Sequence, residues 1–166
     1  MATRLLLISD THVPARARRL PDAVWRAVDG VDLVIHAGDW VDVATLDALD
    51  ERAARLVGVA GNNDGAELHA RLGEFARVDL DGLRIGVVHE TGAATGREAR
   101  LDAAYDDLDV LVFGHSHIPW DTVTPRGIRL LNPGSPTDRR RQPRHTMMTA
   151  VVDDAGRVEV ELRAVE

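Results

Sequence analysis

Five short apolar segments of this chain each stop at a cluster of polar residues. The segments are rich in Val, Leu and Ile and are shorter than an ordinary helix, which is typical of buried β-strands. In chain order, the clusters are Asp10-Thr11-His12, Gly38-Asp39, Gly61-Asn62-Asn63-Asp64, His89 and Gly114-His115-Ser116-His117. Because the carboxyl ends of parallel strands lie at one edge of a sheet, the pattern predicts that these clusters converge.

The first part of the chain alternates strands with helices. We expect strands at Arg4–Ser9, Val31–His36 and Arg55–Ala60, and helices at Leu20–Val28 and Val43–Ala54. The strands are apolar throughout rather than at every second position, which indicates that both of their faces are covered. An alternation of this kind predicts parallel neighbouring strands in an α/β protein.

The remainder of the chain introduces antiparallel pairing. Asp81-Gly82 is a two-residue turn signal between two apolar strands, Phe75–Leu80 and Leu83–His89. We expect a helix at Arg97–Tyr105 and further strands at Val110–Phe113, Trp120–Thr124, Ile128–Leu131, Met147–Val152 and Arg157–Arg163. No repeat or linker divides the chain. The sequence therefore predicts one domain over residues 1–166, with two facing mixed sheets and helices outside them.

Composition narrows the class of protein. The 166 residues are 45% hydrophobic and 28% charged, which is typical of a globular chain rather than a disordered one. The net charge is −7 and all 20 cationic residues are Arg, which weighs against a broad nucleic-acid surface. Without cysteine there is no disulfide and no thiolate zinc site, and no apolar run is long enough to cross a membrane. We expect a cytoplasmic protein with no membrane partner.

The polar clusters contain the residue types that bind divalent metals. Asp10 and His12 are two residues apart, and an extended backbone would send both side chains to the same side. Asp39 and Asn62 each follow a glycine, which permits a tight turn and a close approach of the backbone. Each cluster alone is ordinary turn chemistry. Their joint occurrence at five strand ends favours a metal site.

Together these residues resemble the calcineurin-like metallophosphoesterase superfamily, and the short chain resembles its small bacterial and archaeal phosphodiesterase branch. The turn Asn132-Pro133-Gly134-Ser135, which that branch also carries, strengthens the resemblance. The resemblance implies a four-layer αββα sandwich with two mixed sheets and two metal ions at its edge. It assigns the first metal to Asp10, His12 and His117, the second metal to Asn62, His89 and His115, and the bridge between them to Asp39.

The chemistry of that ligand set suits a phosphate ester. Two divalent cations would carry four positive charges against two carboxylates, Asp10 and Asp39, so that an excess of roughly two positive charges would attract phosphate. The same charge would lower the pKa of a bridging water and produce a hydroxide for attack at phosphorus. Imidazole, carboxylate and amide ligands suit manganese, iron or zinc. The ligand types do not distinguish among these three metals, and we expect manganese.

Three positions near the ligands have open roles. Asn63 stands where many superfamily members have a histidine, and its amide cannot act as an acid. We expect Asn63 to bind substrate by donating a hydrogen bond to phosphate, with a plain turn residue as the alternative. Asp64 is expected to orient a neighbour. Glu90, where the branch often has glycine, either supports a ligand imidazole or faces solvent.

Other polar and aromatic residues have competing interpretations. The run Arg139–Arg141 matches phosphate geometry, but a solvated loop is the favoured interpretation. Trp40 is expected to pack in the core or at its rim, and as the neighbour of Asp39 it is also the tryptophan that could border a substrate. His36 is expected to pack beside its strand, with support of a ligand from behind as the alternative, and His69 is expected at the surface.

The sequence thus predicts a dinuclear metal-dependent phosphodiesterase whose partner is a small phosphate ester. The alternative is a protein-interaction scaffold, because the retromer scaffold subunit resembles this branch in fold and works by protein contacts. The complete ligand set favours the enzyme. Neither the physiological substrate nor the oligomeric state can be read from the sequence.

Overall fold

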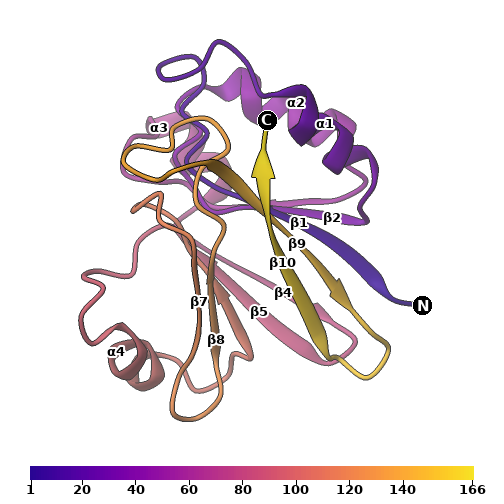
Figure 1. The fold of residues 1–166 in the computed structure, drawn as a ribbon, viewed down its shortest axis with the longest axis vertical. Coiled ribbons are helices and arrows are strands. Elements are labelled where there is room, and N and C mark those ends of the chain that lie inside the picture. Colours follow the sequence, from indigo (N-terminus) through magenta and orange to yellow (C-terminus); the bar gives the residue numbers. More distant parts are fainter.

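Ten strands form two five-stranded sheets in the computed structural model, which describes residues 1–166 (Figure 1). The first sheet has the order β10-β9-β1-β2-β3, and the second has the order β4-β5-β6-β8-β7. The first is composed of β1 (Thr3–Ile8), β2 (Leu33–His36), β3 (Leu56–Gly58), β9 (His145–Val152) and β10 (Val158–Val165). The second is composed of β4 (Phe75–Leu80), β5 (Leu83–Val88), β6 (Val110–Val112), β7 (Trp120–Val123) and β8 (Arg129–Asn132).

Both sheets are mixed, as expected. The strands β1, β2 and β3 are parallel, and β9 pairs antiparallel with both β1 and β10. In the second sheet β5, β6 and β8 are parallel, while β4 and β7 pair antiparallel with their neighbours. The parallel strands β1, β2, β3, β5 and β6 are the ones that precede the polar clusters. Their carboxyl ends are therefore the part of the fold that positions a site.

Alternate residues of β1 enter two different hydrophobic layers. Leu5 and Leu7 belong to a cluster that contains residues of both sheets, whereas Leu6 and Ile8 pack in a cluster with residues of the helices. All four side chains are at most 2% exposed. Burying each one stabilises the fold by about 1.5–3 kcal/mol, so this strand is held on both faces. The continuous apolar character of the segment is explained in this way.

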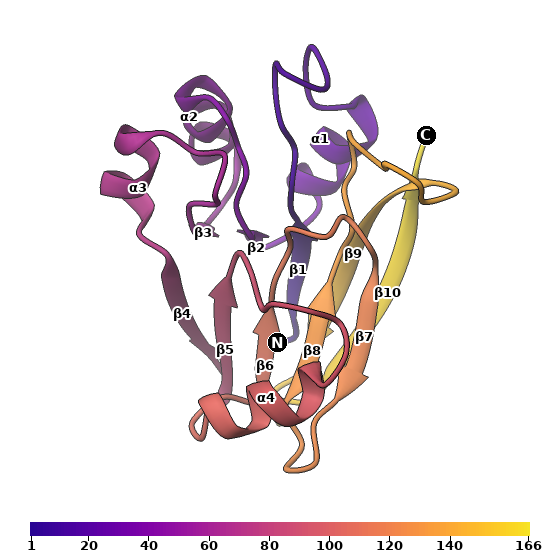
Figure 2. The ribbon, with the colours of Figure 1, turned by 90° about the vertical axis from the view of Figure 1, so that its left-hand side faces the viewer.

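Four helices cover the outer faces of the two sheets (Figure 2). They are α1 (Asp22–Asp29), α2 (Val43–Arg52), α3 (Ala66–Leu72) and α4 (Arg97–Ala104). Helix α2 begins where Asp42 caps it, since the Asp42 carboxylate accepts a hydrogen bond of 3.0 Å from the Thr45 N–H. Val24, Leu46 and Leu68 from the first three helices pack with β1 and β2, whereas Leu101 of α4 packs with the second sheet. The layers are thus helix, sheet, sheet and helix, which confirms the predicted αββα sandwich.

Helix α3 is absent from the sequence-based expectation. Its seven residues include good helix formers, and Gly73 ends it with a φ of 71°. Only Leu68 of this helix is buried, so the segment lacks the long apolar periodicity that marks α1. The other elements begin and end within a few residues of their predicted bounds.

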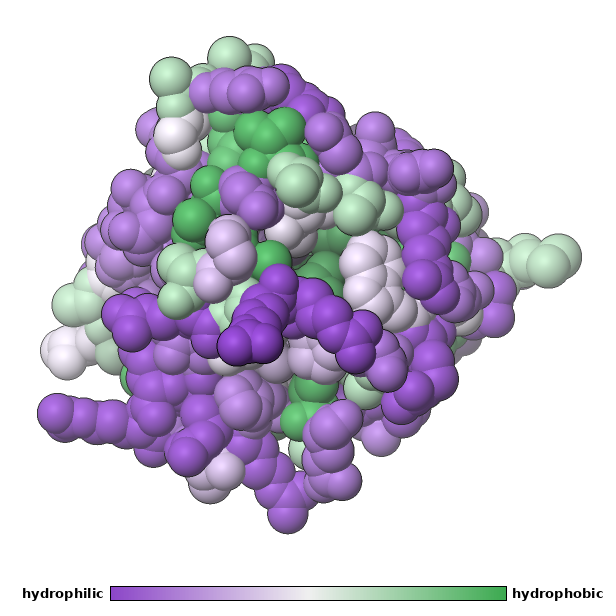
Figure 3. All heavy atoms as spheres, turned by 90° about the horizontal axis from the view of Figure 1, so that it is seen from above, coloured by the Kyte–Doolittle hydropathy of each residue, from purple (hydrophilic) through white to green (hydrophobic).

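Seen from above, the surface is mostly hydrophilic, with hydrophobic residues showing in patches toward the middle (Figure 3). None of the four helices has the length and apolar character needed to cross a bilayer.

Candidate metal centre

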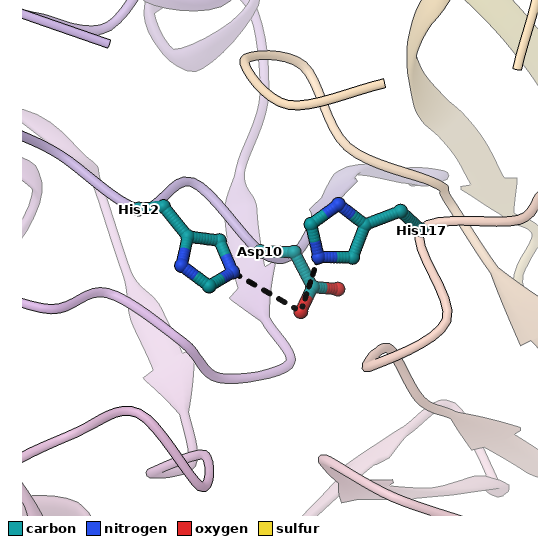
Figure 4. A group of neighbouring side chains, drawn as sticks. All are labelled: Asp10, His12 and His117. Carbon is teal, nitrogen blue, oxygen red and sulfur yellow. Dashed lines mark ion pairs between the residues drawn. The ribbon is translucent and has the colours of Figure 1, made fainter. Parts of the chain in front are cut away.

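Three buried side chains point toward one another in the loops that follow β1 and β6. The Nε2 atoms of His12 and His117 lie 3.9 and 3.5 Å from Oδ1 of Asp10 (Figure 4). Asp10, His12 and His117 are 0, 6 and 1% exposed. None of these three atoms has a hydrogen-bond partner. Since an unpartnered buried polar atom costs about 1–3 kcal/mol, three of them facing one point indicate a cation as the missing partner.

The imidazole of His117 is oriented by a backbone carbonyl. Its Nδ1 lies 2.5 Å from the carbonyl oxygen of Asp138. A carbonyl oxygen can only accept, so Nδ1 donates this hydrogen bond and Nε2 is the nitrogen that faces Asp10. His89 has the same arrangement, with Nδ1 placed 2.7 Å from the Ala37 carbonyl oxygen. In both rings Nε2 is therefore the nitrogen that faces the candidate centre.

A second group of donors surrounds the side-chain oxygen of Asn62. This Oδ1 lies 3.0 Å from Nε2 of His89 and 3.1 Å from Nδ1 of His115. Asn62 is exposed and the His115 side chain is 39% exposed, whereas His89 is buried. The second group is thus more open to solvent than the first.

Asp39 joins the two groups. Its Oδ2 lies 3.4 Å from Nε2 of His12 and 3.3 Å from Nε2 of His89, so that one carboxylate oxygen reaches one imidazole from each group. Asp10, Asp39 and His89 also lie close enough to share one ion. The structure therefore brings together the seven residues that the sequence selected as ligands, Asp10, His12, Asp39, Asn62, His89, His115 and His117. The residues fit a metal centre, and their individual roles as ligands stay a prediction.

The backbone reaches this arrangement by a different route from the expected one. Asp10, His12, His115 and His117 have φ values of 56, 45, 73 and 61°, and Asp39 has 60°. The backbone of these residues is in the left-handed conformation. The prediction that an extended backbone places the Asp10 and His12 side chains on the same side is therefore wrong. Left-handed conformations of non-glycine residues cost about 1–3 kcal/mol each and persist where the surroundings impose them. Here five such residues occur together at the candidate centre.

Glycines precede three of the ligands because a side chain would collide with the centre. A Cβ on Gly38 would lie 2.6 Å from Nδ1 of His89, and one on Gly114 would lie 2.6 Å from Oδ2 of Asp10. A Cβ on Gly61 would strike the carboxylate of Asp39. The requirement for glycine at these positions is therefore steric, and at Gly38 the φ of 99° also favours glycine.

The buried carboxylate of Asp64 holds two ligand loops together. Its Oδ2 accepts hydrogen bonds from the backbone N–H groups of Asp39 (2.9 Å) and Gly61 (2.7 Å), and its Oδ1 accepts one from Val41 (2.7 Å). Asp64 thus fixes the turn that carries Asp39 against the turn that carries Asn62. This agrees with the expectation that Asp64 orients a neighbour.

The carboxylate of Asp39 is stabilised in its ionised form. Burial raises its pKa, but hydrogen bonds from His89 and from the backbone and side chain of Asn63 outweigh this effect and hold the pKa well below its ordinary value. In contrast, burial lowers the pKa of His89, yet Asp39 and Asp10 raise it above the ordinary value. For His12, burial dominates over the attraction of Asp39 and lowers the pKa.

Two aromatic residues behind the centre form a buried stack. The rings of His36 and Trp40 lie 3.6 Å apart and both residues are 0% exposed. His36 accepts a hydrogen bond from the Gly38 N–H at Nδ1 and faces the Thr11 hydroxyl at Nε2. His36 thus supports the ligand loops from behind. The sequence left open that Trp40 borders a substrate. This interpretation is wrong, because Trp40 is fully buried.

Two serines support Asp10: Ser9, which was not singled out from the sequence, and Ser135, which belongs to the turn that strengthened the family resemblance. The Ser9 hydroxyl donates to Oδ2 of Asp10, and the Ser135 hydroxyl donates to the backbone carbonyl oxygen of Asp10, each over 2.7 Å.

Glu90 has one carboxylate oxygen 3.7 Å from Nε2 of His115, without a hydrogen bond, and its side chain is 55% exposed. Glu90 therefore faces solvent beside a ligand.

The fold and the donor set together define a metal-binding α/β protein with its centre at the carboxyl ends of the strands. Residues 3–155 match the family model of the calcineurin-like phosphoesterase superfamily domain. The chain belongs to this superfamily. It is 37% identical over 150 residues to a probable metallophosphoesterase of Methanocaldococcus jannaschii, covering 89% of this chain and 75% of that protein.

Solved structures share the same fold. The protein TM1076 of Thermotoga maritima is 35% identical, with a TM-score of 0.74 and coverage of 98% of this chain and 99% of the other. The Vps29 protein of Entamoeba histolytica, solved with Zn²⁺, is 23% identical, with a TM-score of 0.77 and coverage of 98% and 99%. At that identity the second likeness shows the fold alone.

Proposed function

We propose that this protein is a phosphodiesterase that uses two divalent cations to hydrolyse a small phosphate ester. The observation that carries the proposal is the convergence of two donor groups on Asp39, one of them with three unpartnered buried atoms. A relative named as a phosphodiesterase in Methanocaldococcus jannaschii is 25% identical over 127 residues, covering 67% of this chain and 71% of that protein. That name is consistent with action on diesters.

Each donor group would hold one cation, and Asp39 would contact both. Asp10, His12 and His117 would hold the first cation, Asn62, His89 and His115 the second, and Asp39 both. When bound, the cations supply Lewis-acid charge that binds phosphoryl oxygens and lowers the pKa of an attacking water. The chain itself supplies orientation, since the Asp138 and Ala37 carbonyls fix the tautomers of His117 and His89. The three donors of the first group are buried, so water is excluded from that side of the centre.

Asn63 is the proposed substrate contact. Its side-chain Nδ2 donates to Oδ2 of Asp39 over 2.9 Å in the structure. Binding of a cation to Asp39 would compete for that oxygen and release the amide, which is exposed and free to turn toward a phosphoryl oxygen. An amide donor has no proton to give to a leaving group, so a preference for good leaving groups is part of the proposal.

Metal analysis combined with hydrolysis tests this function against the scaffold alternative. Protein purified without chelator and then loaded with Mn²⁺ is expected to bind about two ions per chain and to hydrolyse bis(p-nitrophenyl) phosphate. Treatment with a chelator should abolish hydrolysis, and Mn²⁺ should restore it better than Zn²⁺ or Fe²⁺. A protein that binds no metal and has no turnover would support a scaffold, and full activity of the metal-free protein would refute the metal-dependent reaction. A cytoplasmic location is part of the same proposal.

A further inference from the structure

The candidate centre is accessible from one side only. The first donor group is buried, with Asp10 and His117 at most 1% exposed. In the second group Asn62 is exposed and the His115 side chain is 39% exposed. A phosphate ester must therefore approach from the side of Asn62 and His115. Its organic groups must then contact the part of the protein surface next to these two residues.

A cleft of about 270 Å³ adjoins the second group. Asn62 and His89 form part of its wall, so the cleft is continuous with the candidate centre, and Ala60, Gly61 and Val88 line it as well. Its volume accommodates a small organic group of a few heavy atoms. The cleft is thus placed to receive one ester group of a substrate whose phosphate lies at the centre.

The ionisable groups of this cleft are two carboxylates and two histidines. Glu74 and Glu90 contribute the carboxylates, and no arginine lines the cleft although the chain contains 20 cationic residues. His69 has its Nε2 3.1 Å from the Gly61 carbonyl oxygen and its Nδ1 3.8 Å from a Glu74 carboxylate oxygen. The 3.8 Å separation is too long for a hydrogen bond, so the Glu74 carboxylate has no hydrogen-bond partner in the cleft. The cleft is negatively charged next to a centre that attracts anions.

An arginine stands beside the centre at His115. Nη1 of Arg140 lies 3.3 Å from the backbone carbonyl oxygen of His115, and Arg140 is absent from the cleft lining. The phosphate and the organic group of one substrate would thus meet environments of opposite charge. A diester with a cationic alcohol group matches this polarity, whereas a second phosphate or a carboxylate in the cleft would be repelled.

Resting on the phosphodiesterase function proposed above, we infer that the cleft lined by Glu74 and Glu90 binds one ester group of the substrate and selects a cationic alcohol. The natural substrate class is then a small diester of an amino or quaternary ammonium alcohol. Nucleic acids and other polyanions are disfavoured, because their next phosphate would enter the cleft.

The test compares three p-nitrophenyl phosphodiesters that differ in the charge of the second alcohol. The alcohols are choline, its uncharged isostere 3,3-dimethylbutanol, and the anionic 4-hydroxybutanoate. At low ionic strength the choline diester should exceed the anionic one roughly tenfold or more in kcat/KM, since two carboxylates act at short range, and added salt should reduce the ratio. Calorimetric dissociation constants of the matching phosphonates, which are not hydrolysed, should follow the same order.

The double variant Glu74→Gln, Glu90→Gln should bring the ratio close to one while still hydrolysing the uncharged diester. Glu159→Gln, on an exposed position of β10 outside the cleft, is the matched control and should keep the wild-type ratio. Equal rates for all three diesters, or a ratio unchanged in the double variant, would overturn the inference while the uncharged diester still reports phosphodiesterase activity. Absence of hydrolysis of all three diesters would overturn the proposed function itself, and phosphonate binding that does not depend on charge would overturn the selection.

Discussion

Asn63 donates two hydrogen bonds to Asp39, one from its backbone N–H to Oδ1 and one from its side chain to Oδ2, each 2.9 Å long. The carboxylate that lies between the two donor groups is therefore held by the residue that follows the candidate ligand Asn62. The position of Asp39 therefore depends on Asn63, which stands where many members of the superfamily have a histidine.

Replacing Asn63 with histidine should change how the rate depends on the leaving group. A histidine at this position can donate a proton, which contributes roughly 10²–10⁴-fold where the leaving group is poor. We expect Asn63→His to accelerate hydrolysis of alkyl diesters with little effect on p-nitrophenyl diesters, measured as the slope of log kcat against leaving-group pKa. Asn63→Ala is the control and should keep the steep slope. An unchanged slope in Asn63→His would show that position 63 does not reach the substrate.

Asp39→Asn should remove metal from both donor groups. Asp39 lies within 3.4 Å of one imidazole from each group, so loss of its charge weakens both at once. We expect the metal content to fall below one ion per chain and kcat/KM to fall at least about 100-fold. The control is Asp47→Asn, an exposed carboxylate in an ion pair with Arg71. Two ions per chain in Asp39→Asn, measured by elemental analysis, would contradict a bridging role.

Gly61→Ala should damage the centre, whereas Gly65→Ala should not. The added Cβ at position 61 would strike the Asp39 carboxylate, while at position 65 nothing lies within 4 Å and the φ of −78° suits alanine. We expect Gly61→Ala to lose at least about 1–3 kcal/mol of stability, as overpacking typically does, together with metal binding. Chemical denaturation and metal titration of the two variants measure the difference. Equal behaviour of the two would mean that the turn at Gly61 relaxes without cost.

His36 should make the metal-free protein less stable at acidic pH. Full burial lowers the pKa of His36 well below its ordinary 6.5, so near neutral pH the folded ring stays neutral while the unfolded chain takes up a proton as the pH falls. Stability from this group is complete above pH 6.5 and declines below it by at most about 1.4 kcal/mol per pH unit.

The variant His36→Gln isolates this effect, because glutamine does not titrate. Its free energy of unfolding in the presence of a chelator, measured between pH 5 and 7 by denaturant titration, should fall less steeply with acid than that of the wild type. The variant is also expected to be less stable at neutral pH, since His36 meets Gly38 and Thr11. Parallel pH profiles would show that His36 is protonated in the folded protein.

The sandwich could be predicted because the determining signals are local. β1 is apolar at every position from Leu5 to Ile8, and this follows from its two buried faces. The hairpin turn at Asp81-Gly82 was identified for the same reason, since these two residues adopt the positive φ values of 50 and 86° that such a turn requires. Helix α3 was missed because one buried leucine does not make a periodic pattern.

The order of the strands and the polar residues at their ends were sufficient to predict which residues meet. How they meet depends on the folded chain, because left-handed backbone at Asp10, Asp39 and His115 is unfavourable for an isolated chain. Contacts between distant segments impose it: the His115 N–H donates to Asp10 from 105 residues away, and Asp64 accepts from the Asp39 N–H. The burial of Trp40 and the acidic cleft beside Asn62 likewise depend on neighbours that only folding brings together.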